Sequence, residues 1–216
     1  MLKRNKGTIV LTTFLTALPM LMGLVLWSRL PETIATHFGA DGTPDGWSSK
    51  AFAVFGLPAF LAAVHLVCAF GTMADPKKKN IQDKMYRLVL WICPVVSILV
   101  CTCVYLYALG MDVDMALIAE IMVGMMFLIV GNYLPKCRQS YTMGIKLPWT
   151  LSDEENWNAT HRFGGWVWMA CGVVFLGMAA LGGLNTVWTL GLILAAVGLP
   201  TLYSFRYYLR HKEEEV

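Results

Sequence analysis

Six long apolar runs, separated by short polar segments, constrain the fold of this chain more than any other feature. A helix needs about 20 mostly apolar residues to cross the hydrocarbon core of a bilayer. Runs of about this length occupy residues 8–28, 51–70, 87–108, 115–134, 163–181 and 187–208. Only 14% of the residues are charged, whereas soluble domains carry about 25%. The sequence therefore predicts an all-α integral membrane protein with six transmembrane helices, forming a single polytopic domain of residues 1–216.

Basic residues orient the predicted helices. All but two of the 17 Lys and Arg residues fall on one predicted side of the membrane. The two exceptions, Arg29 and Lys50, lie in the loop of residues 29–50. Because loops rich in basic residues remain in the cytoplasm, we expect residues 29–50 to face outward. Both termini and the loop of residues 135–162 are then cytoplasmic.

These two loops share short sequence motifs: each begins with Leu-Pro, contains Ala-Thr-His and ends with Gly-Trp. The outer loop reads LPETIATHFGADGTPDGW from Leu30, and the inner loop reads LPWTLSDEENWNATHRFGGW from Leu147. Each is the first loop of a three-helix half, and the two loops would face opposite sides of the membrane. This is the form of a 3+3 inverted-topology repeat. The distance between Leu-Pro and Ala-Thr-His differs between the loops, so chance recurrence of short words is the alternative interpretation.

The outer loop is rich in turn-forming residues. Residues 41–46 read DGTPDG, in which Gly supplies positive φ, Pro fixes φ and Asp bonds its own backbone. This predicts a compact loop, either a cap over the helix ends or a surface that meets something outside the cell. A metal site built from His37, Asp41 and Asp45 is a further alternative, but their spacing matches no established pattern. We expect no metal and no cofactor.

The inner loop carries a helix-start signal. Residues 152–155 read Ser-Asp-Glu-Glu, which is typical of a capping box in which Ser accepts from the first-turn amides, so a helix should begin near Asp153. Four residues at spacings of three or four share one stripe of that helix: Trp157, His161, Gly164 and Trp168. The stripe either packs against neighbouring helices or forms a docking surface for a cytoplasmic partner.

Two ionisable residues, His65 and Glu120, lie inside apolar runs, where such residues are functional candidates by default. We expect His65 to hydrogen-bond a neighbouring helix. Glu120 lies near the predicted outer end of its helix, close to the level of Arg29 and Lys50. We expect it to form a buried pair or to line a polar cavity there, with either a structural or a ligand-binding role.

Sequence motifs for catalysis are absent. The chain contains no H-E-x-x-H, no G-x-S-x-G and no P-loop, the words that would indicate zinc hydrolases, serine hydrolases or nucleotide binding. The basic cluster of residues 77–79 is explained as a topology signal. We therefore predict that the protein is not an enzyme and does not bind nucleic acid directly.

The two loops also carry residues by which the chain resembles the SdpI family of bacterial multipass membrane proteins. In the outer loop the matching words are Leu30-Pro31, Thr36-His37-Phe38, Pro44-Asp45-Gly46-Trp47 and Lys50. Around the inner loop they are GNYLPK from Gly131, Arg138-Gln139, GIKLPWTL from Gly144, Trp157 and Thr160-His161-Arg162. Together these words run from the first predicted helix to the fifth, so the resemblance covers most of the chain.

The named member of that family protects a toxin-producing bacterium from its own secreted antimicrobial peptide. It also holds a soluble transcriptional repressor at the membrane when the toxin is present. The resemblance implies a membrane immunity and signalling protein of the bacterial cell membrane, whose partners are the lipid bilayer, a peptide toxin outside and a repressor inside. The outer candidates for peptide binding are His37, Phe38, Asp41, Asp45, Trp47 and Glu120. The cytoplasmic candidates for partner binding are Lys136, Arg138, Gln139, Trp149, Asp153, Trp157, His161 and Arg162.

Two other function classes remain as alternatives. A transporter or exporter of a small molecule or peptide is suggested by the repeat interpretation, by Glu120 and by prolines within four of the apolar runs. Prolines free backbone carbonyls and kink helices. A membrane enzyme acting at the inner loop would use Asp153 and His161 for acid–base chemistry.

Overall fold

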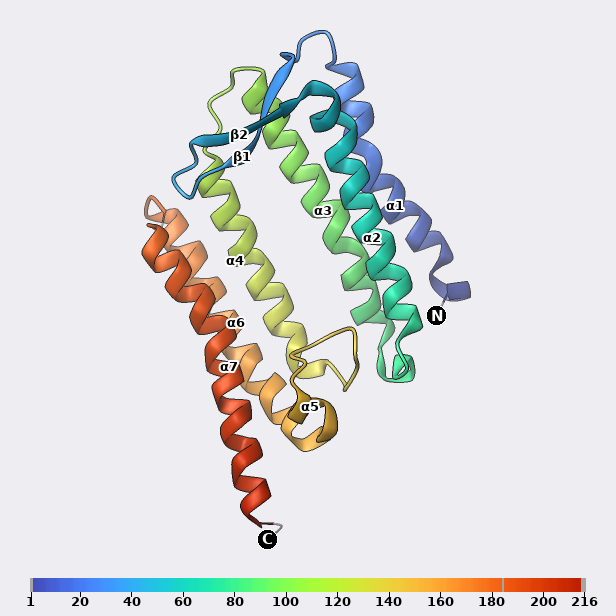
Figure 1. Ribbon diagram of the computed structural model, residues 1–216, viewed down its shortest axis with the longest axis vertical. Coiled ribbons are helices and arrows are strands. Elements are labelled where there is room, and N and C mark those ends of the chain that lie inside the picture. Colours follow the sequence, from blue (N-terminus) through green and yellow to red (C-terminus); the bar gives the residue numbers. More distant parts are fainter. Residues whose placement is uncertain (1, 184, 215–216) are drawn as a thin grey trace. The chain divides into compact units, whose positions relative to one another are not determined.

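The computed structural model describes residues 2–183 and 185–214, and its long elements are helices (Figure 1). The six expected membrane helices are confirmed, because each is long and apolar enough to cross a bilayer. They are α1 (Leu2–Val25), α2 (Leu57–Ala74), α3 (Asp83–Ala108), α4 (Met115–Tyr133), α6 (Glu154–Ala180) and α7 (Thr186–Glu214). A helix satisfies its backbone hydrogen bonds internally, which is the condition for crossing a bilayer.

Short elements lie between the long helices. A π-helical turn, η1 (Phe52–Gly56), leads into α2, and a short helix, α5 (Pro148–Ser152), precedes α6. Two 3₁₀ turns, η2 (Lys78–Asn80) and η3 (Leu134–Lys136), lie before α3 and after α4. The start of α6 near Asp153 agrees with the expected position.

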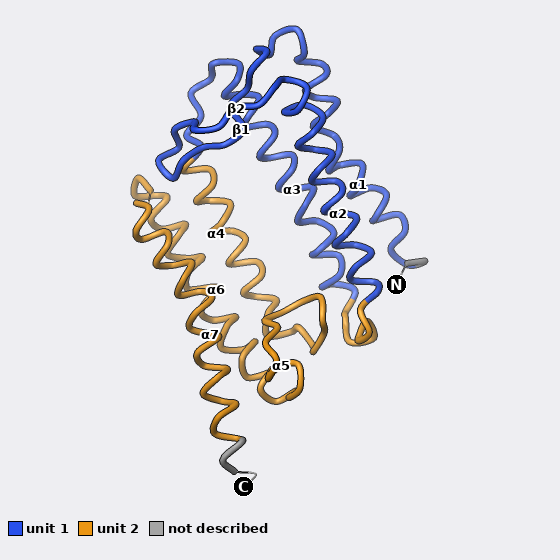
Figure 2. Tube along the Cα trace, in the orientation of Figure 1, with its two compact units in different colours: residues 1–74, 83–115 blue, residues 75–82, 116–216 orange. Residues whose placement is uncertain are grey.

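The chain divides into two compact units (Figure 2). Unit 1 comprises Met1–Ala74 and Asp83–Met115, and unit 2 comprises Asp75–Gln82 and Ala116–Val216. Unit 1 contains α1, α2 and α3, and unit 2 contains α4, α6 and α7. The segment of residues 75–82 packs with unit 2 although it lies in sequence between two helices of unit 1. The inverted repeat stays a prediction.

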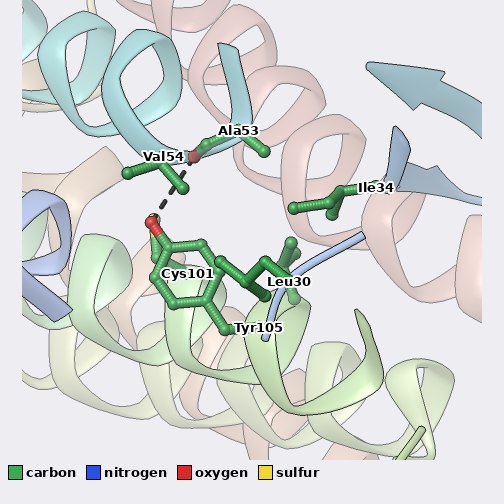
Figure 3. Close-up of a cluster of buried hydrophobic side chains, with 7 residues drawn as sticks. Leu30, Ile34, Ala53, Val54, Cys101 and Tyr105 are labelled. Carbon is green, nitrogen blue, oxygen red and sulfur yellow. Dashed lines mark hydrogen bonds between the residues drawn. The ribbon is translucent and has the colours of Figure 1, made fainter. Parts of the chain in front are cut away.

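In unit 1, α1, α2 and α3 each pack against the other two. One end of this bundle is closed by a buried cluster that includes Leu30, Ile34, Val54 and Tyr105 (Figure 3). The Tyr105 hydroxyl donates to the carbonyl oxygens of Pro19 (3.2 Å) and Ala53 (3.5 Å). A buried phenol needs such an acceptor, and here its bonds tie α3 to α1 and η1.

The loop after α1 folds into a β-hairpin, a feature that the sequence did not predict beyond a compact turn. Strands β1 (Thr33–Phe38) and β2 (Pro44–Ser49) pair antiparallel. At the tip, the Asp41 carboxylate accepts from the backbone N–H and the hydroxyl of Thr43, and Gly42 has φ 78°. The predicted turn chemistry therefore operates, but it closes a hairpin of residues 33–49.

In unit 2, glycines allow α4 and α6 to approach closely. Gly131 on α4 and Gly165 on α6 face each other, and a Cβ on Gly165 would lie 2.8 Å from the Gly131 carbonyl oxygen. Two helical turns further along, a Cβ on Gly172 would lie 2.8 Å from the Gly124 carbonyl oxygen. Small residues at such positions are the usual way for membrane helices to pack backbone against backbone.

The Ala-Thr-His words of the two loops do not mark equivalent structural positions. Residues 35–37 lie on the extended strand β1, whereas residues 159–161 lie within the helix α6. The shared letters therefore do not reflect a shared local structure. Side chains alternate across a strand but repeat about every 3.6 residues on a helix, so the same three letters present their side chains differently.

Candidate functional sites

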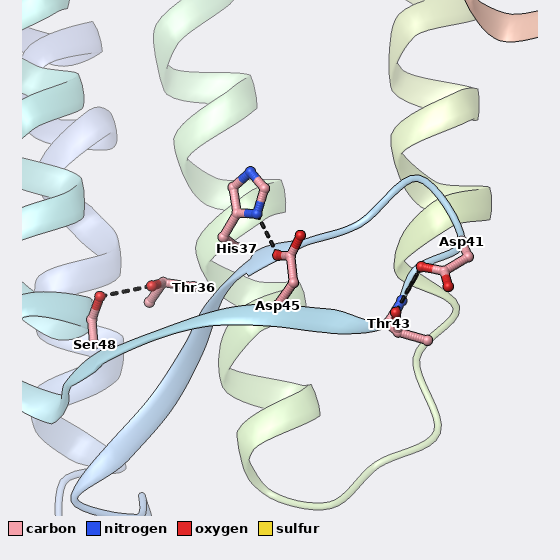
Figure 4. Close-up of polar contacts among 6 residues, drawn as sticks. All are labelled: Thr36, His37, Asp41, Thr43, Asp45 and Ser48. Carbon is pink, nitrogen blue, oxygen red and sulfur yellow. Dashed lines mark hydrogen bonds and ion pairs between the residues drawn. The ribbon is translucent and has the colours of Figure 1, made fainter. Parts of the chain in front are cut away.

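One face of the hairpin is anchored to unit 1. The Ile34 side chain is only 1% exposed and belongs to the buried cluster. Phe38 contacts Tyr107 of α3 edge to face, with ring centroids 5.1 Å apart. Between the strands, the hydroxyls of Thr36 and Ser48 are hydrogen-bonded at 2.7 Å (Figure 4). These contacts fix the orientation of the hairpin on its own bundle.

The other hairpin face is exposed and carries three of the candidate peptide-binding residues. His37 Nδ1 lies 2.5 Å from Asp45 Oδ1 (Figure 4), with the two side chains 76% and 52% exposed. Trp47 is 58% exposed. At the tip, hydrogen bonds from the side chain and backbone of Thr43 lower the pKa of Asp41 below its usual range. The hairpin thus presents a carboxylate, a hydrogen-bonded histidine–aspartate pair and a large aromatic ring.

Lys50 closes the base of the hairpin. Its Nζ pairs with Glu32 Oε1 at 2.8 Å, donates to the Trp27 carbonyl at 3.2 Å and lies 5.1 Å from the centre of the Trp27 ring. A buried ammonium requires partners of this kind. Glu120 lies in unit 2, where its Oε2 is 3.1 Å from the position that a Cβ on Gly183 would occupy. Its expected association with Arg29 or Lys50 stays a prediction.

His65 is fully buried in unit 1, and the expected hydrogen bond to a neighbouring helix is confirmed. Its Nε2 lies 3.1 Å from Thr12 Oγ1 on α1. The Thr12 hydroxyl also lies 2.7 Å from the Thr8 carbonyl, to which it donates. It therefore accepts from the imidazole, which places the His65 proton on Nε2.

In unit 2, Asp75 holds the segment between α4 and α6, which we call the inter-helix segment (residues 134–153). Its Oδ2 accepts from the backbone N–H groups of Tyr141 and Thr142 at 2.9 Å each and from the Thr142 hydroxyl at 2.6 Å. Its Oδ1 accepts from the Lys77 N–H at 2.7 Å. Burial raises the pKa of Asp75, but the hydrogen bonds from Thr142, Lys77 and Tyr141 outweigh burial and hold that pKa below its ordinary value.

Sequence reasoning missed Asp75. The available signal was an acid directly before Pro76, five residues after the end of the apolar run of residues 51–70.

Gln139 is the second anchor of the inter-helix segment and is buried. Its Nε2 donates to the carbonyls of Thr150 (2.8 Å) and Leu151 (3.0 Å). Its Oε1 accepts from the Lys77 ammonium, and its backbone carbonyl accepts from Asn80 Nδ2. The side chain therefore joins the segment of residues 75–82 to α5.

Trp157 and His161 form the third anchor, and both are buried. Trp157 Nε1 donates to the Cys137 carbonyl at 2.8 Å, and His161 Nε2 accepts from the Ile145 N–H at 2.9 Å. Because Nε2 accepts, the ring proton lies on Nδ1, which donates to the Trp157 carbonyl at 2.7 Å. The two rings stack with centroids 4.0 Å apart. Both imidazole nitrogens are thus engaged with backbone groups.

The predicted start of a helix near Asp153 is confirmed, but the prediction that Ser152 caps it is wrong. Asp153 caps α6, because its side chain accepts from the backbone N–H groups of Glu155 (2.8 Å) and Asn156 (3.2 Å). Ser152 instead ends α5, where its hydroxyl donates to the Trp149 carbonyl. The short helix α5, which the sequence did not reveal, takes Ser152 out of the capping position.

A second cluster that sequence reasoning missed joins α6 to α7. Ser204 accepts from Trp149 Nε1 at 2.8 Å and donates to Asn156 Oδ1 at 2.9 Å. Asn156 Nδ2 donates back to the Ser204 carbonyl at 3.1 Å, and Thr160 donates to Asn156 Oδ1. The candidate residue Trp149 therefore contributes to this junction through its indole N–H.

The remaining candidate residues of unit 2 are exposed. Arg138 is solvent-facing, and Lys136 Nζ lies over the Tyr133 ring at 5.2 Å from its centre. Arg162 lines an open cleft of about 520 Å³. Within the described ranges, no group of three or more His, Cys, Asp or Glu side chains is arranged to hold a metal ion.

The fold and these sites define a class of protein: a multi-pass membrane protein whose first loop is an anchored hairpin and whose inter-helix segment is held by buried polar side chains. Residues 136–204 match the SdpI/YfhL protein family, and residues 14–62 match a domain of unknown function, DUF1648. The chain is 25% identical over 204 residues to Immunity protein SdpI of Bacillus subtilis (strain 168), covering 92% of this chain and 95% of that protein. The resemblance to the SdpI family is thereby confirmed. No solved structure matches the chain significantly.

Proposed function

We propose that this protein is a membrane immunity protein, which protects the cell that carries it from a secreted antimicrobial peptide. The observation that carries the proposal is the similarity, over 92% of the chain, to a protein named as an immunity protein. The chain has six helices that are long and apolar enough to span a membrane, which supports a role at the membrane, where such a peptide acts.

The hairpin is the part of the chain that we propose meets the peptide. The distribution of basic residues predicts that it faces outward. Its exposed face combines Trp47 with the pair His37 and Asp45, and exposed tryptophans are frequent anchors of binding energy. Because the opposite face is packed on the bundle through Ile34 and Phe38, little ordering of the surface is needed on binding.

A survival assay tests both parts of the proposal. Wild type, Trp47→Ala and Trp166→Ala would be expressed at matched levels in a sensitive bacterium and challenged with the peptide toxin of an SdpI-family operon. Trp166 is an exposed tryptophan of α6 and serves as the control. We expect wild type and Trp166→Ala to protect, and Trp47→Ala to lower the tolerated peptide concentration about tenfold or more, as loss of a binding anchor does.

The outcomes separate the two claims. Failure of well-expressed wild type to protect would reject the immunity function for that peptide. Full protection by Trp47→Ala would keep the immunity function and remove the hairpin face as the peptide-binding surface.

For the cytoplasmic face we propose docking of a soluble transcriptional repressor. Arg138 is exposed on a segment that Asp75 and Gln139 hold in place, so a charged group is presented from a fixed backbone. The test is co-sedimentation of a repressor encoded beside the gene with vesicles that contain the protein and the peptide. We expect Arg138→Glu to reduce co-sedimentation and Lys79→Glu, on the exposed η2 turn, to leave it unchanged; equal retention by both variants would contradict the site.

A further inference from the structure

The open cleft of about 520 Å³ in unit 2 is lined by Pro135, Glu155, Asn158, Arg162 and Tyr207. Its volume lies within the roughly 300–1,000 Å³ of small-molecule sites. Three of the lining residues come from the first turns of α6 at spacings of three and four, so they share one face of that helix. Tyr207 comes from α7 and Pro135 from η3. The cleft face of α6 carries none of the side chains that anchor the inter-helix segment.

Three polar side chains of the cleft have no hydrogen-bonding or ion-pair partner in the described part of the protein. Glu155, Asn158 and Arg162 are exposed, and their side chains make no hydrogen bond or ion pair within the described part of the chain. A carboxylate and a guanidinium therefore face the same open space without pairing to each other. A ligand that carries both a negative and a positive charge would satisfy both groups.

The position of the cleft along α6 indicates where this ligand comes from. With 27 residues, α6 is about 40 Å long, longer than the hydrocarbon core of about 30 Å. The apolar run of α6 starts at Phe163. Arg162 therefore lies at the border of the apolar zone, and Glu155 lies about 10 Å further toward water along the helix axis.

This order of charges is that of zwitterionic phospholipids. In a phospholipid with an ethanolamine headgroup, the phosphate lies next to the apolar zone and the primary ammonium lies further out. Guanidinium groups bind phosphate through paired charge-assisted hydrogen bonds, and a carboxylate accepts from a primary ammonium. We propose that the cleft binds the headgroup of phosphatidylethanolamine, with Arg162 on the phosphate, Glu155 on the ammonium, and Asn158 and Tyr207 as further hydrogen-bonding groups. This site is independent of the proposed immunity function.

Native mass spectrometry of the full chain in detergent, after removal of bound lipid, tests the site. Phosphatidylethanolamine, phosphatidylglycerol and phosphatidylcholine with identical acyl chains would be titrated separately. We expect phosphatidylethanolamine to bind tightest, because only it supplies both a phosphate and an ammonium that donates hydrogen bonds. Arg162→Gln should weaken its binding about tenfold, the loss expected for charge-assisted hydrogen bonds. Glu155→Gln should abolish the preference over phosphatidylglycerol, and the control Lys79→Gln should change neither affinity nor preference.

Soluble glycerophosphoethanolamine distinguishes the headgroup from the acyl chains. Its competition with the lipid, lost in Arg162→Gln, supports recognition of the headgroup itself. Equal binding of the three lipids by wild type, unaffected by either cleft substitution, would show annular lipid only and overturn the proposal. A preference for phosphatidylglycerol would overturn it as well, because Glu155 would then have no partner in the ligand.

Discussion

The hairpin and the inter-helix segment solve the same problem, the placement of a polar loop on a bundle of membrane helices, in opposite ways. The hairpin satisfies its backbone by strand pairing and anchors itself through the apolar side chains of Ile34 and Phe38. The inter-helix segment is largely irregular and is held by the buried polar side chains of Asp75, Gln139 and His161. Strand pairing leaves the polar side chains of the hairpin exposed, whereas the irregular segment uses its polar side chains for its own structure.

His37 and His161, the histidines of the two Ala-Thr-His motifs, show this difference between the hairpin and the inter-helix segment most directly. The His37 side chain is 76% exposed and pairs with Asp45, whereas His161 is 1% exposed and bonds two backbone groups. The recurring histidine is therefore an exposed group in the hairpin and a structural group in α6. The three predictions below test this contrast in order of decreasing effect.

The largest effect is expected from His161→Ala compared with His37→Ala. Removing the His161 ring leaves the Ile145 N–H without its acceptor, removes the stack on Trp157 and opens a cavity. We expect a loss of about 3–4 kcal/mol in the free energy of unfolding. The exposed pair of His37 contributes at most about 1 kcal/mol. Unfolding in mild detergent, followed by tryptophan fluorescence, measures both; similar losses for the two variants would refute the contrast.

Gly144→Ala tests how tightly the inter-helix segment is seated. Gly144 has φ 106°, and a Cβ there would overlap the His161 ring and lie 2.7 Å from the Trp157 ring. Backbone strain and overpacking together should lower the free energy of unfolding by about 3 kcal/mol. Gly110→Ala is the matched control, since Gly110 has φ 81° but open space around it, and should show only the strain of about 1 kcal/mol. Equal losses would mean that the rings tolerate a methyl group at residue 144.

Asp75→Asn is expected to cost about 2 kcal/mol, because an amide has one acceptor oxygen where the carboxylate serves four donors through two oxygens. The folded-state pKa of Asp75 lies below its ordinary value of 3.8. The stabilisation is therefore fully present above pH 3.8 and is lost as the pH falls through the lower, folded-state pKa.

The control for the Asp75→Asn prediction is the pH dependence of the free energy of unfolding. The difference in free energy of unfolding between wild type and Asp75→Asn should be constant from neutral pH down to about pH 4 and shrink below it. A difference that vanishes already near neutral pH would show that the Asp75 carboxylate is not stabilised by its hydrogen bonds.

Much of the architecture could be predicted from local sequence. The six helices follow from the length of the apolar runs, and the start of α6 follows from the acids near Asp153. The strand pairing of the hairpin was not predictable, because residues 33–38 form a strand only through pairing with residues 44–49 and packing of Ile34 on α3 and η1. The capping role of Asp153 was assigned to Ser152 because α5 had not been recognised.

For the candidate site residues too, local sequence predicted one part and tertiary contacts decided the other. Residue type identified Trp157, His161 and Gln139 as notable, but only their burial and bonding partners show that they hold the inter-helix segment. Asp75 escaped notice because its partners, Tyr141 and Thr142, lie more than 60 residues away in the chain.

The sequence by itself determined that this is a membrane protein with six helices, because a bilayer leaves a long apolar run no other way to satisfy its backbone hydrogen bonds. The tertiary structure alone decided which polar side chains are exposed and which are buried in hydrogen bonds. Whether a histidine or an acid is exposed depends on hydrogen-bond partners from distant segments. Those partners come within reach only when the chain has folded, so no local pattern of residues encodes them.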